Sequence, residues 1–230
     1  LVHHQPVGVS LLITPWNFPA AMATRKMGPA LAAGCTCVLK PATETPLTAY
    51  AIADIMHRAG VPKGVVNVIT PSKTSEVMGA VIQDDRVRKV SFTGSTQVGR
   101  VLLAQAAQNV LKCSMELGGN APFIVFEDAD LEAAVEGAMI AKMRNGGEAC
   151  TAANRFLVHE NVKDRFVAML SARMGGLKVG DGLGKGVQCG PMINEGAINT
   201  IQALVDDAVG AGASITTGGN AMEGEGHFFA

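Results

Sequence analysis

Strand-length apolar segments alternate with helix-length segments along the first half of the chain, and this alternation is the strongest constraint on the fold. Residues 7–13 and 35–39 are mostly apolar and have the length expected of buried strands. The alanine-rich segment between them, 20–33, has the length of a helix and ends at Gly34, a residue type that readily terminates helices. The three segments therefore predict a strand, a helix and a second strand in succession.

The alternation continues to residue 115. Thr45 and Pro46 predict the start of a helix, because Thr caps helix N-termini and Pro is favoured at the first helical position. This helix runs to Ala59 and ends at Gly60. The remaining expected elements are a strand over 65–69, a helix over 73–82, a strand over 88–92, a helix over 95–107 and a strand over 111–115. Such an alternation predicts an α/β fold with a doubly wound parallel sheet.

A second run of elements begins after Gly118 and Gly119. It comprises a strand over 122–126, a helix over 130–142, a strand over 155–159, helices over 163–173 and 195–209, and a short strand over 213–217. We expect a dinucleotide-binding domain over 1–117 and part of an α/β catalytic domain over 118–230. The chain opens almost directly into a strand and ends without a capping element, so we expect it to be a piece of a longer protein.

Composition and charge exclude several classes of function. The 230 residues are 48% hydrophobic and 17% charged, which is typical of a soluble globular protein. The net charge is −1 and the Lys and Arg residues are scattered, so no basic face is available to a nucleic acid. The longest uncharged segment, 27–39, is too short to cross a bilayer, and we expect no membrane partner.

Cysteine and histidine usage argues against disulfides and metal sites. The cysteines are odd in number and lack Cys-x-x-Cys spacing, which favours a reducing cytoplasm. The histidines show no helical metal-ligand spacing, and we expect no metal. A free thiol packed as a small hydrophobic group is the expected state of Cys35, Cys37, Cys113 and Cys189.

Three segments offer the residue types that covalent chemistry on a carbonyl group needs. Cys150 follows the glycine pair 146–147, where small residues let a substrate approach the thiolate. Glu116 offers a carboxylate base before a Gly-Gly pair, and Asn17 offers an amide donor between two prolines that stiffen its backbone. A cysteine hydrolase would also use such a thiol, but it normally pairs the thiol with histidine, and no histidine lies in a motif here.

Five motifs together point to a family. They are Pro-Trp-Asn-Phe-Pro at 15–19, Lys40-Pro41, Phe-Thr-Gly-Ser-Thr at 92–96, Glu-Leu-Gly-Gly-Asn at 116–120 and the segment around Cys150. In this order they resemble the aldehyde dehydrogenase superfamily. The resemblance covers essentially the whole chain but only about half of a typical family member, because a later Glu-x-Phe-Gly motif and the C-terminal oligomerisation strand are absent. It implies that the full-length protein is a homo-oligomer.

The resemblance implies a role for each of the three reactive side chains. Cys150 is the expected nucleophile, which converts an aldehyde into a thiohemiacetal. The Asn17 carboxamide and the backbone N–H of Cys150 are expected to stabilise its oxyanion. After hydride has left for nicotinamide, Glu116 is expected to act as the general base that activates water against the thioester.

The resemblance also implies a nicotinamide coenzyme. The expected coenzyme contacts are Trp16, Asn17, Lys40, Thr43, Gly94, Ser95 and Leu117. Gly94 and Ser95 follow a strand and open a helix, where free N–H groups and the helix dipole favour a pyrophosphate. Glu at position 43 in relatives binds the ribose hydroxyls and repels a 2′-phosphate. Thr43 removes that charge, so we expect NADP as the preferred coenzyme, with NAD possible, unless Glu44 points inward. Trp16 is equally compatible with a core anchor.

Two arginines narrow the expected substrate. Arg25 and Arg144 lie where the resemblance to the succinate-semialdehyde dehydrogenases places carboxylate-binding arginines, and a surface salt bridge is the alternative for each. Paired guanidinium groups orient a carboxylate, so we expect oxidation of succinate semialdehyde. Three alternatives stay open: the substrate is glutarate semialdehyde, the substrate is another aldehyde, or the chain is a catalytically incompetent piece. Glu148 stands where many relatives have Gln, and its direction decides whether its charge affects the thiol.

Overall fold

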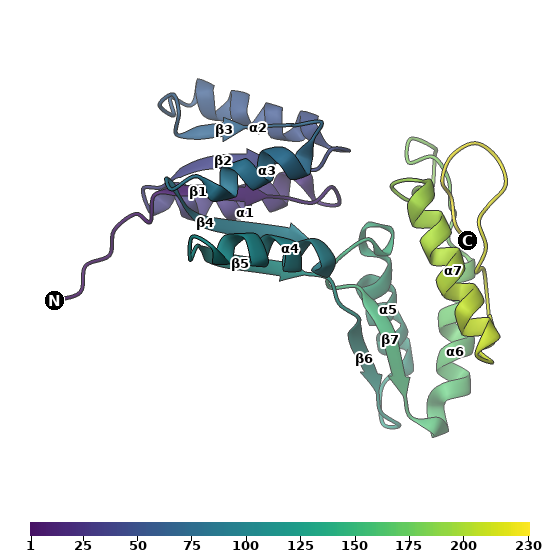
Figure 1. The fold of residues 1–230 in the computed structure, drawn as a ribbon. Coiled ribbons are helices and arrows are strands. Elements are labelled where there is room, and N and C mark those ends of the chain that lie inside the picture. Colours follow the sequence, from purple (N-terminus) through teal and green to yellow (C-terminus); the bar gives the residue numbers. More distant parts are fainter. The chain divides into compact units, whose positions relative to one another are not determined.

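The computed structural model describes residues 1–230, which form two compact α/β units (Figure 1). The first unit is Leu1–Gly118 and the second is Gly119–Ala230. The expected domain boundary lies one residue earlier, and the assignment of the two domains to coenzyme binding and to catalysis stays a prediction. None of the helices combines the length and the apolar character that a membrane span requires.

The first unit contains a five-stranded parallel sheet in the order β3-β2-β1-β4-β5 (Figure 1). Its strands are β1 (Val9–Ile13), β2 (Thr36–Lys40), β3 (Val66–Val68), β4 (Val87–Gly94) and β5 (Lys112–Leu117). Its helices are α1 (Pro19–Ala32), α2 (Pro46–Arg58), α3 (Thr74–Gln83) and α4 (Thr96–Ala107). The strand order reverses beside β1, and this confirms the expected doubly wound parallel sheet.

Strand β1 lies at the centre of the unit, and its side chains point alternately to two helix layers. Leu12 packs with Met27 of α1 and Ala49 of α2 in one core cluster. Leu11 and Ile13 belong to the other cluster, which includes apolar side chains of α3 and α4. Both faces of this parallel strand are therefore buried, which explains why its sequence is apolar except for the buried Ser10.

The start of α2 differs in one detail from the expectation. Thr45 occupies the N-cap position and Pro46 lies in the first turn, but the Thr45 side chain makes no capping hydrogen bond. Its hydroxyl oxygen is buried without a hydrogen-bond partner. The proline alone therefore accounts for the start of this helix, since its fixed φ suits the first turn. In α4, by contrast, the Ser95 hydroxyl accepts a hydrogen bond from the Val98 N–H at 3.3 Å.

The second unit is built on a two-stranded parallel sheet of β6 (Ala121–Val125) and β7 (Ala153–Val158). Helix α5 (Leu131–Met143) and the 3₁₀ turn η1 (Arg144–Gly147) connect the strands, and α6 (Glu160–Gly175) and α7 (Glu195–Gly210) follow. Val125, Val135 and Phe166 form the centre of its core, with Phe166 stacked at a tilt on Phe156.

The strand expected over 213–217 is absent. This segment has no hydrogen-bonded strand neighbour, and a strand exists only where a neighbour supplies a ladder. Its hydroxyls contact α6 instead, with Ser171 Oγ and Thr216 Oγ1 3.0 Å apart. The other expected strands and helices are present with shifts of a few residues at their ends.

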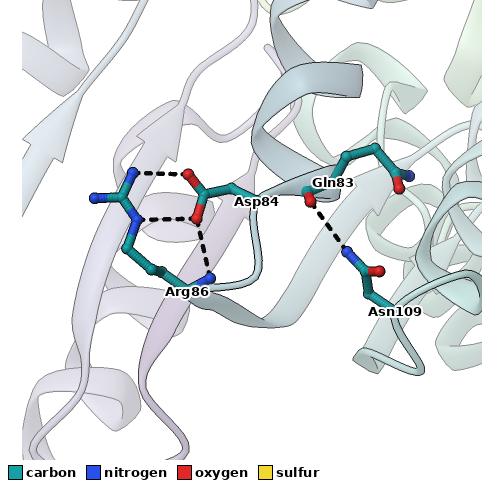
Figure 2. Close-up of polar contacts among 4 residues, drawn as sticks. All are labelled: Gln83, Asp84, Arg86 and Asn109. Atoms are coloured by element: carbon teal, nitrogen blue, oxygen red, sulfur yellow. Dashed lines mark hydrogen bonds and ion pairs between the residues drawn. The ribbon is translucent and has the colours of Figure 1, made fainter.

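The connection from α3 to β4 is held by two polar contacts (Figure 2). Arg86 donates to both carboxylate oxygens of Asp84, with its Nε 2.9 Å from Oδ1 and its Nη2 2.7 Å from Oδ2, and this guanidinium holds the pKa of Asp84 well below its usual range. The Asn109 side-chain amide donates to the carbonyl oxygen of Gln83 at 3.2 Å. The amide thereby satisfies a carbonyl group at the C-terminus of α3.

The turn after α4 contains a strained residue. Val110 has a φ of 49° and is 87% exposed, although it is β-branched. The N–H groups of Val110 and Leu111 donate back to Ala107 and Ala106, the pattern of a helix end that normally carries glycine in the left-handed position. The turn therefore forces Val110 into a backbone conformation that its side chain opposes.

We expect Val110→Gly to raise the free energy of unfolding by about 1 kcal/mol, because glycine adopts the left-handed conformation without steric cost. The measurement is urea unfolding of the 230-residue chain, followed through the fluorescence of Trp16, its only tryptophan. Val110→Ala should give a smaller gain. A lower unfolding midpoint for the glycine variant would show that the Val110 side chain stabilises the turn.

Candidate active site

A cleft opens at the carboxyl ends of β1, β2 and β4, where parallel α/β sheets collect ligands. Its volume is about 610 Å³. Among the residues that line it are five of the expected coenzyme contacts: Trp16, Lys40, Thr43, Gly94 and Ser95. Asn17 and Leu117 are not among its lining residues. The structure thus brings five dispersed residues of the first unit to one cleft, and their role in binding stays a prediction.

The glycines beside this cleft allow close packing at the start of α4. A Cβ atom on Gly94 would lie 2.5 Å from the Phe92 ring, and one on Gly99 would lie 2.7 Å from Leu117 Cδ2. The Leu117 side chain therefore packs against the first turn of α4, in contact with Gly99. Both glycines therefore have a packing function at the start of α4, where Ser95, Gln97 and Val98 line the cleft.

The far end of the cleft surrounds Lys40, the last residue of β2. Burial lowers the pKa of Lys40, and the nearby Glu44 carboxylate partly opposes this shift. Thr43 and Glu44 are both exposed and both line the cleft. A smaller cavity of about 330 Å³ adjoins Lys40 and Thr43 on the side of Tyr50. A ligand anion at this end would meet one lysine and one carboxylate.

Asn17 lies in the connection between β1 and α1, directly after Trp16. The Asn17 carboxamide oxygen is buried. The connection is held in place because the Thr14 N–H donates to the Lys40 carbonyl oxygen at 3.1 Å and the Met22 N–H donates to the Phe18 carbonyl oxygen at 2.8 Å. Backbone hydrogen bonds therefore fix the chain on both sides of Asn17.

Arg25 and Glu116, expected to serve substrate binding and base catalysis, form an ion pair within the first unit. Arg25 Nη2 lies 3.9 Å from Glu116 Oε1, and both side chains are about half exposed. Exposed ion pairs contribute at most about 1 kcal/mol, so this contact is readily exchanged for others. The pair corresponds to the salt-bridge alternative for Arg25, and it brings a cation to the carboxylate that the sequence singles out as the base.

Lys26 is a buried cation that the motifs did not indicate. It is 8% exposed, and its Nζ donates to Ser91 Oγ at 3.0 Å. Burial and then the Arg25 charge lower its pKa from 10.5 to about 8, while Glu116 opposes the shift. Helical periodicity offers a signal for this position, since Lys26 lies between the buried Ala23 and Met27 of α1.

A cavity of about 390 Å³, lined by apolar as well as charged side chains, gathers these groups on the α1 side of the sheet. Arg25, Lys26 and Glu116 line it together with Lys89 and Ser114 of β4 and β5. Lys89 Nζ donates to Ser114 Oγ at 2.7 Å. Glu116 therefore shares this cavity with three cationic side chains, those of Arg25, Lys26 and Lys89.

Cys150 lies in the second unit, in the segment 144–152, which we call the Cys150 loop. Three consecutive residues before it, Asn145, Gly146 and Gly147, have positive φ values of 55°, 65° and 82°. Cys150 is exposed, whereas Cys35, Cys37 and Cys189 are buried and Cys113 is half-buried. The loop geometry therefore leaves one thiol open to reagents.

Glu148 is directed toward the segment before α7. Its Oε1 accepts a hydrogen bond from the Ile193 N–H at 3.3 Å. Burial raises the pKa of Glu148, and burial followed by the Glu148 charge raises the pKa of Cys189. The sequence left open where the Glu148 side chain points. In the structure its carboxylate joins the Cys150 loop to the backbone of Ile193.

Arg144, the second expected substrate arginine, is the first residue of the Cys150 loop. It is exposed, and its φ of −54° and ψ of 124° end the helical path of α5. Cys150 and Arg144 thus belong to the second unit, whereas Asn17, Arg25 and Glu116 belong to the first. The structure assembles no group of three or more His, Cys, Asp or Glu side chains that could hold a metal ion.

We expect the stability difference between the wild type and Lys26→Met to depend on pH. The unfolded chain retains the proton of Lys26 up to pH 10.5, but the folded chain releases it near pH 8. Between these values the unfolded state binds more protons, so wild-type stability rises with pH relative to the variant. Urea unfolding at several pH values across this window checks the trend, and a constant difference would contradict it.

Known proteins are similar in sequence to this chain over its whole length. The aldehyde dehydrogenase family profile matches residues 1–230. Succinate-semialdehyde dehydrogenase of Paenarthrobacter nicotinovorans is 60% identical over 229 residues, which are 100% of this chain and 51% of that protein. Glutarate-semialdehyde dehydrogenase of Pseudomonas putida is 53% identical over 224 residues, which are 97% of this chain and 46% of that protein.

A solved crystal structure is similar to this chain in both sequence and fold. The crystal structure of an NADP-dependent enzyme of E. coli has a TM-score of 0.94 and 54% identity, covering 98% of this chain and 47% of that one. The chain thus spans about half the length of the relatives it matches. The sequence matches and the structural match agree with the five motifs and the α/β fold: the chain belongs to the aldehyde dehydrogenase family.

Proposed function

We propose that the protein containing this chain oxidises a short aldehyde with a terminal carboxylate, succinate semialdehyde, to the corresponding acid with NADP⁺. The observation that carries this proposal is the exposure of Cys150 alone among the cysteines, shortly after three left-handed residues, in a chain of this family. The relatives named as semialdehyde dehydrogenases support the substrate class.

The reaction begins with attack of the Cys150 thiolate on the aldehyde carbon, which forms a carbon–sulfur bond and an oxyanion. The Asn17 carboxamide and the Cys150 N–H donate hydrogen bonds to this oxygen. NADP⁺, when bound, supplies a pyridinium ring that accepts the hydride from the same carbon. The thioester that remains is hydrolysed by water, whose proton passes to the Glu116 carboxylate, and the acid leaves as the thiol re-forms.

This mechanism is tested by the appearance of reduced coenzyme, followed by its near-ultraviolet absorbance in the whole protein. Cys150→Ser should abolish turnover with every aldehyde, and Glu116→Gln should arrest the enzyme as the thioester after a single burst of reduced coenzyme. Steady turnover by either variant would assign its role to another residue.

The coenzyme preference rests on Thr43. The adjoining cavity near Tyr50 gives room for a group larger than a hydroxyl, and Lys40 supplies a cation at this end of the cleft. Glu44 lines the same cleft, so a 2′-phosphate would be attracted by one neighbour and repelled by another. NADP is the proposed coenzyme, and NAD remains a substrate. The E. coli relative of known structure is an NADP-dependent enzyme, which supports this choice.

We expect Thr43→Glu to raise the KM for NADP⁺ at least about tenfold, because a second carboxylate near a 2′-phosphate costs on the order of 1 kcal/mol or more. The KM for NAD⁺ should stay the same or fall, and Thr43→Ser serves as the control that keeps the hydroxyl. Steady-state kinetics with both nucleotides measure the ratio. An unchanged ratio in Thr43→Glu would place the 2′-position elsewhere.

The substrate preference rests on Arg144 and Arg25. Arg144 is exposed at the start of the Cys150 loop, and Arg25 forms a weak ion pair with Glu116. The Arg25 guanidinium can therefore turn to a substrate carboxylate at little cost, and we propose Arg144 as the second guanidinium that binds this carboxylate. Glutarate semialdehyde is the second candidate, since relatives named for it are as similar as several named for succinate semialdehyde.

We expect Arg144→Lys to raise the KM for succinate semialdehyde about tenfold or more while the KM for propanal stays within a factor of about two, because only the acidic aldehyde loses a charge-assisted hydrogen bond. Initial rates with both aldehydes provide the test. Equal losses on the two substrates would rule out a carboxylate clamp, and the same assay with glutarate semialdehyde separates the two candidates.

The cellular setting follows from the same features. Five free cysteines fit a reducing compartment, and we propose the cytoplasm. We further propose that the whole protein is a homo-oligomer, as the family resemblance implies.

A further inference from the structure

Lys142 joins the two ends of the Cys150 loop. It lies in the last turn of α5, two residues before the loop begins, and its Nζ donates to Asn154 Oδ1 at 2.6 Å. Asn154 lies in β7, two residues after the loop ends. One hydrogen bond therefore closes the base of the loop that carries Cys150.

A second hydrogen bond extends this contact to a third segment. Asn154 Nδ2 donates to Asn120 Oδ1 at 3.3 Å. Asn120 directly precedes β6 and is the last residue of the Glu-Leu-Gly-Gly-Asn motif that begins at Glu116. The ammonium of Lys142 is thus linked through one side chain to the segment that follows the proposed base.

The loop backbone also packs on Lys142. Gly147 has a φ of 82°, and a Cβ atom on it would lie 3.2 Å from the Lys142 carbonyl oxygen and 3.6 Å from its Nζ. A side chain at 147 would therefore be crowded against the Lys142 carbonyl oxygen, and the left-handed φ of this position disfavours any residue other than glycine.

The partial burial of Lys142 gives its hydrogen bond to Asn154 a structural role. The Lys142 side chain is half-buried, so its ammonium has lost part of its hydration, and this burial lowers its pKa. A charge-assisted hydrogen bond to an amide oxygen offsets part of this loss, and such bonds are short and strong. Ile140 and Arg144, two residues to either side, are exposed, so a lysine without a partner could reach water with its flexible stem.

We propose that Lys142 is a positioning residue for Cys150: its ammonium joins the end of α5 to β7 and to Asn120, and holds the Cys150 loop in the conformation that presents the thiol. The inference rests on the proposed role of Cys150 as the nucleophile. Lys142 acts through the loop backbone and takes no part in the chemical steps.

The test combines amide hydrogen exchange and kinetics in the whole protein. Lys142→Met keeps the stem and removes the donor, Asn154→Ala removes the acceptor, and Lys142→Arg keeps a cation that can donate. In the Met and Ala variants, amides of 144–152 should exchange at least about fivefold faster, because local opening becomes easier. The kcat should fall about tenfold or more, with the KM for NADP⁺ within a factor of about two.

Rescue and a matched control separate positioning from general destabilisation. Lys142→Arg should restore slow exchange and most of kcat, whereas Lys163→Met, the same change at an exposed lysine of α6, should alter neither. The double variant Lys142→Met with Asn154→Ala should be no worse than the poorer single variant, since the bond that Lys142→Met removes is one of the two that Asn154→Ala removes.

Three results would overturn the proposal. They are unchanged loop exchange in Lys142→Met, faster exchange spread over α5 and α6, and losses that add in the double variant. Turnover by Cys150→Ser would refute the proposed nucleophile instead, and it is distinguishable because the exchange measurement needs neither substrate nor coenzyme.

Discussion

Burial of β1 on both faces is the constraint on which the first unit depends. Leu11, Leu12 and Ile13 are almost completely inaccessible to solvent, and they point alternately to the two helix layers. With β2 on one side and β4 on the other, all in parallel, the carboxyl ends of these strands must meet at one edge. The cleft lined by Trp16, Lys40 and Gly94 is a direct consequence.

Three lysines share a second property, a pKa lowered chiefly by burial: Lys26, Lys40 and Lys142. Each has a polar neighbour in the structure, namely the Ser91 hydroxyl, the Glu44 carboxylate and the Asn154 amide. Removing a cation from water costs free energy that such a neighbour only partly returns. Such positions are therefore suited to orienting other groups, whether these are anions, a carboxylate base or a loop.

The fold was largely predictable, because strands buried on both faces leave a predominantly apolar segment in the sequence and glycines mark several helix ends. The exceptions have physical causes. Residues 213–217 have strand-like composition, but composition cannot supply a hydrogen-bonding neighbour. Thr45 occupies a capping position, yet its hydroxyl is turned into the interior. The left-handed conformation of Val110 opposes local preference and is imposed by the turn between α4 and β5.

By itself, the sequence determined the family, the alternation of strands and helices, and the residue types available for thiol chemistry, since these are properties of order along the chain. Only the tertiary structure decided which side chains meet. It paired Arg25 with Glu116, directed Glu148 to Ile193, buried Lys26 against Ser91 and closed the Cys150 loop through Lys142 and Asn154. Such contacts join residues that are distant in sequence, and their geometry follows from packing, which no local pattern encodes.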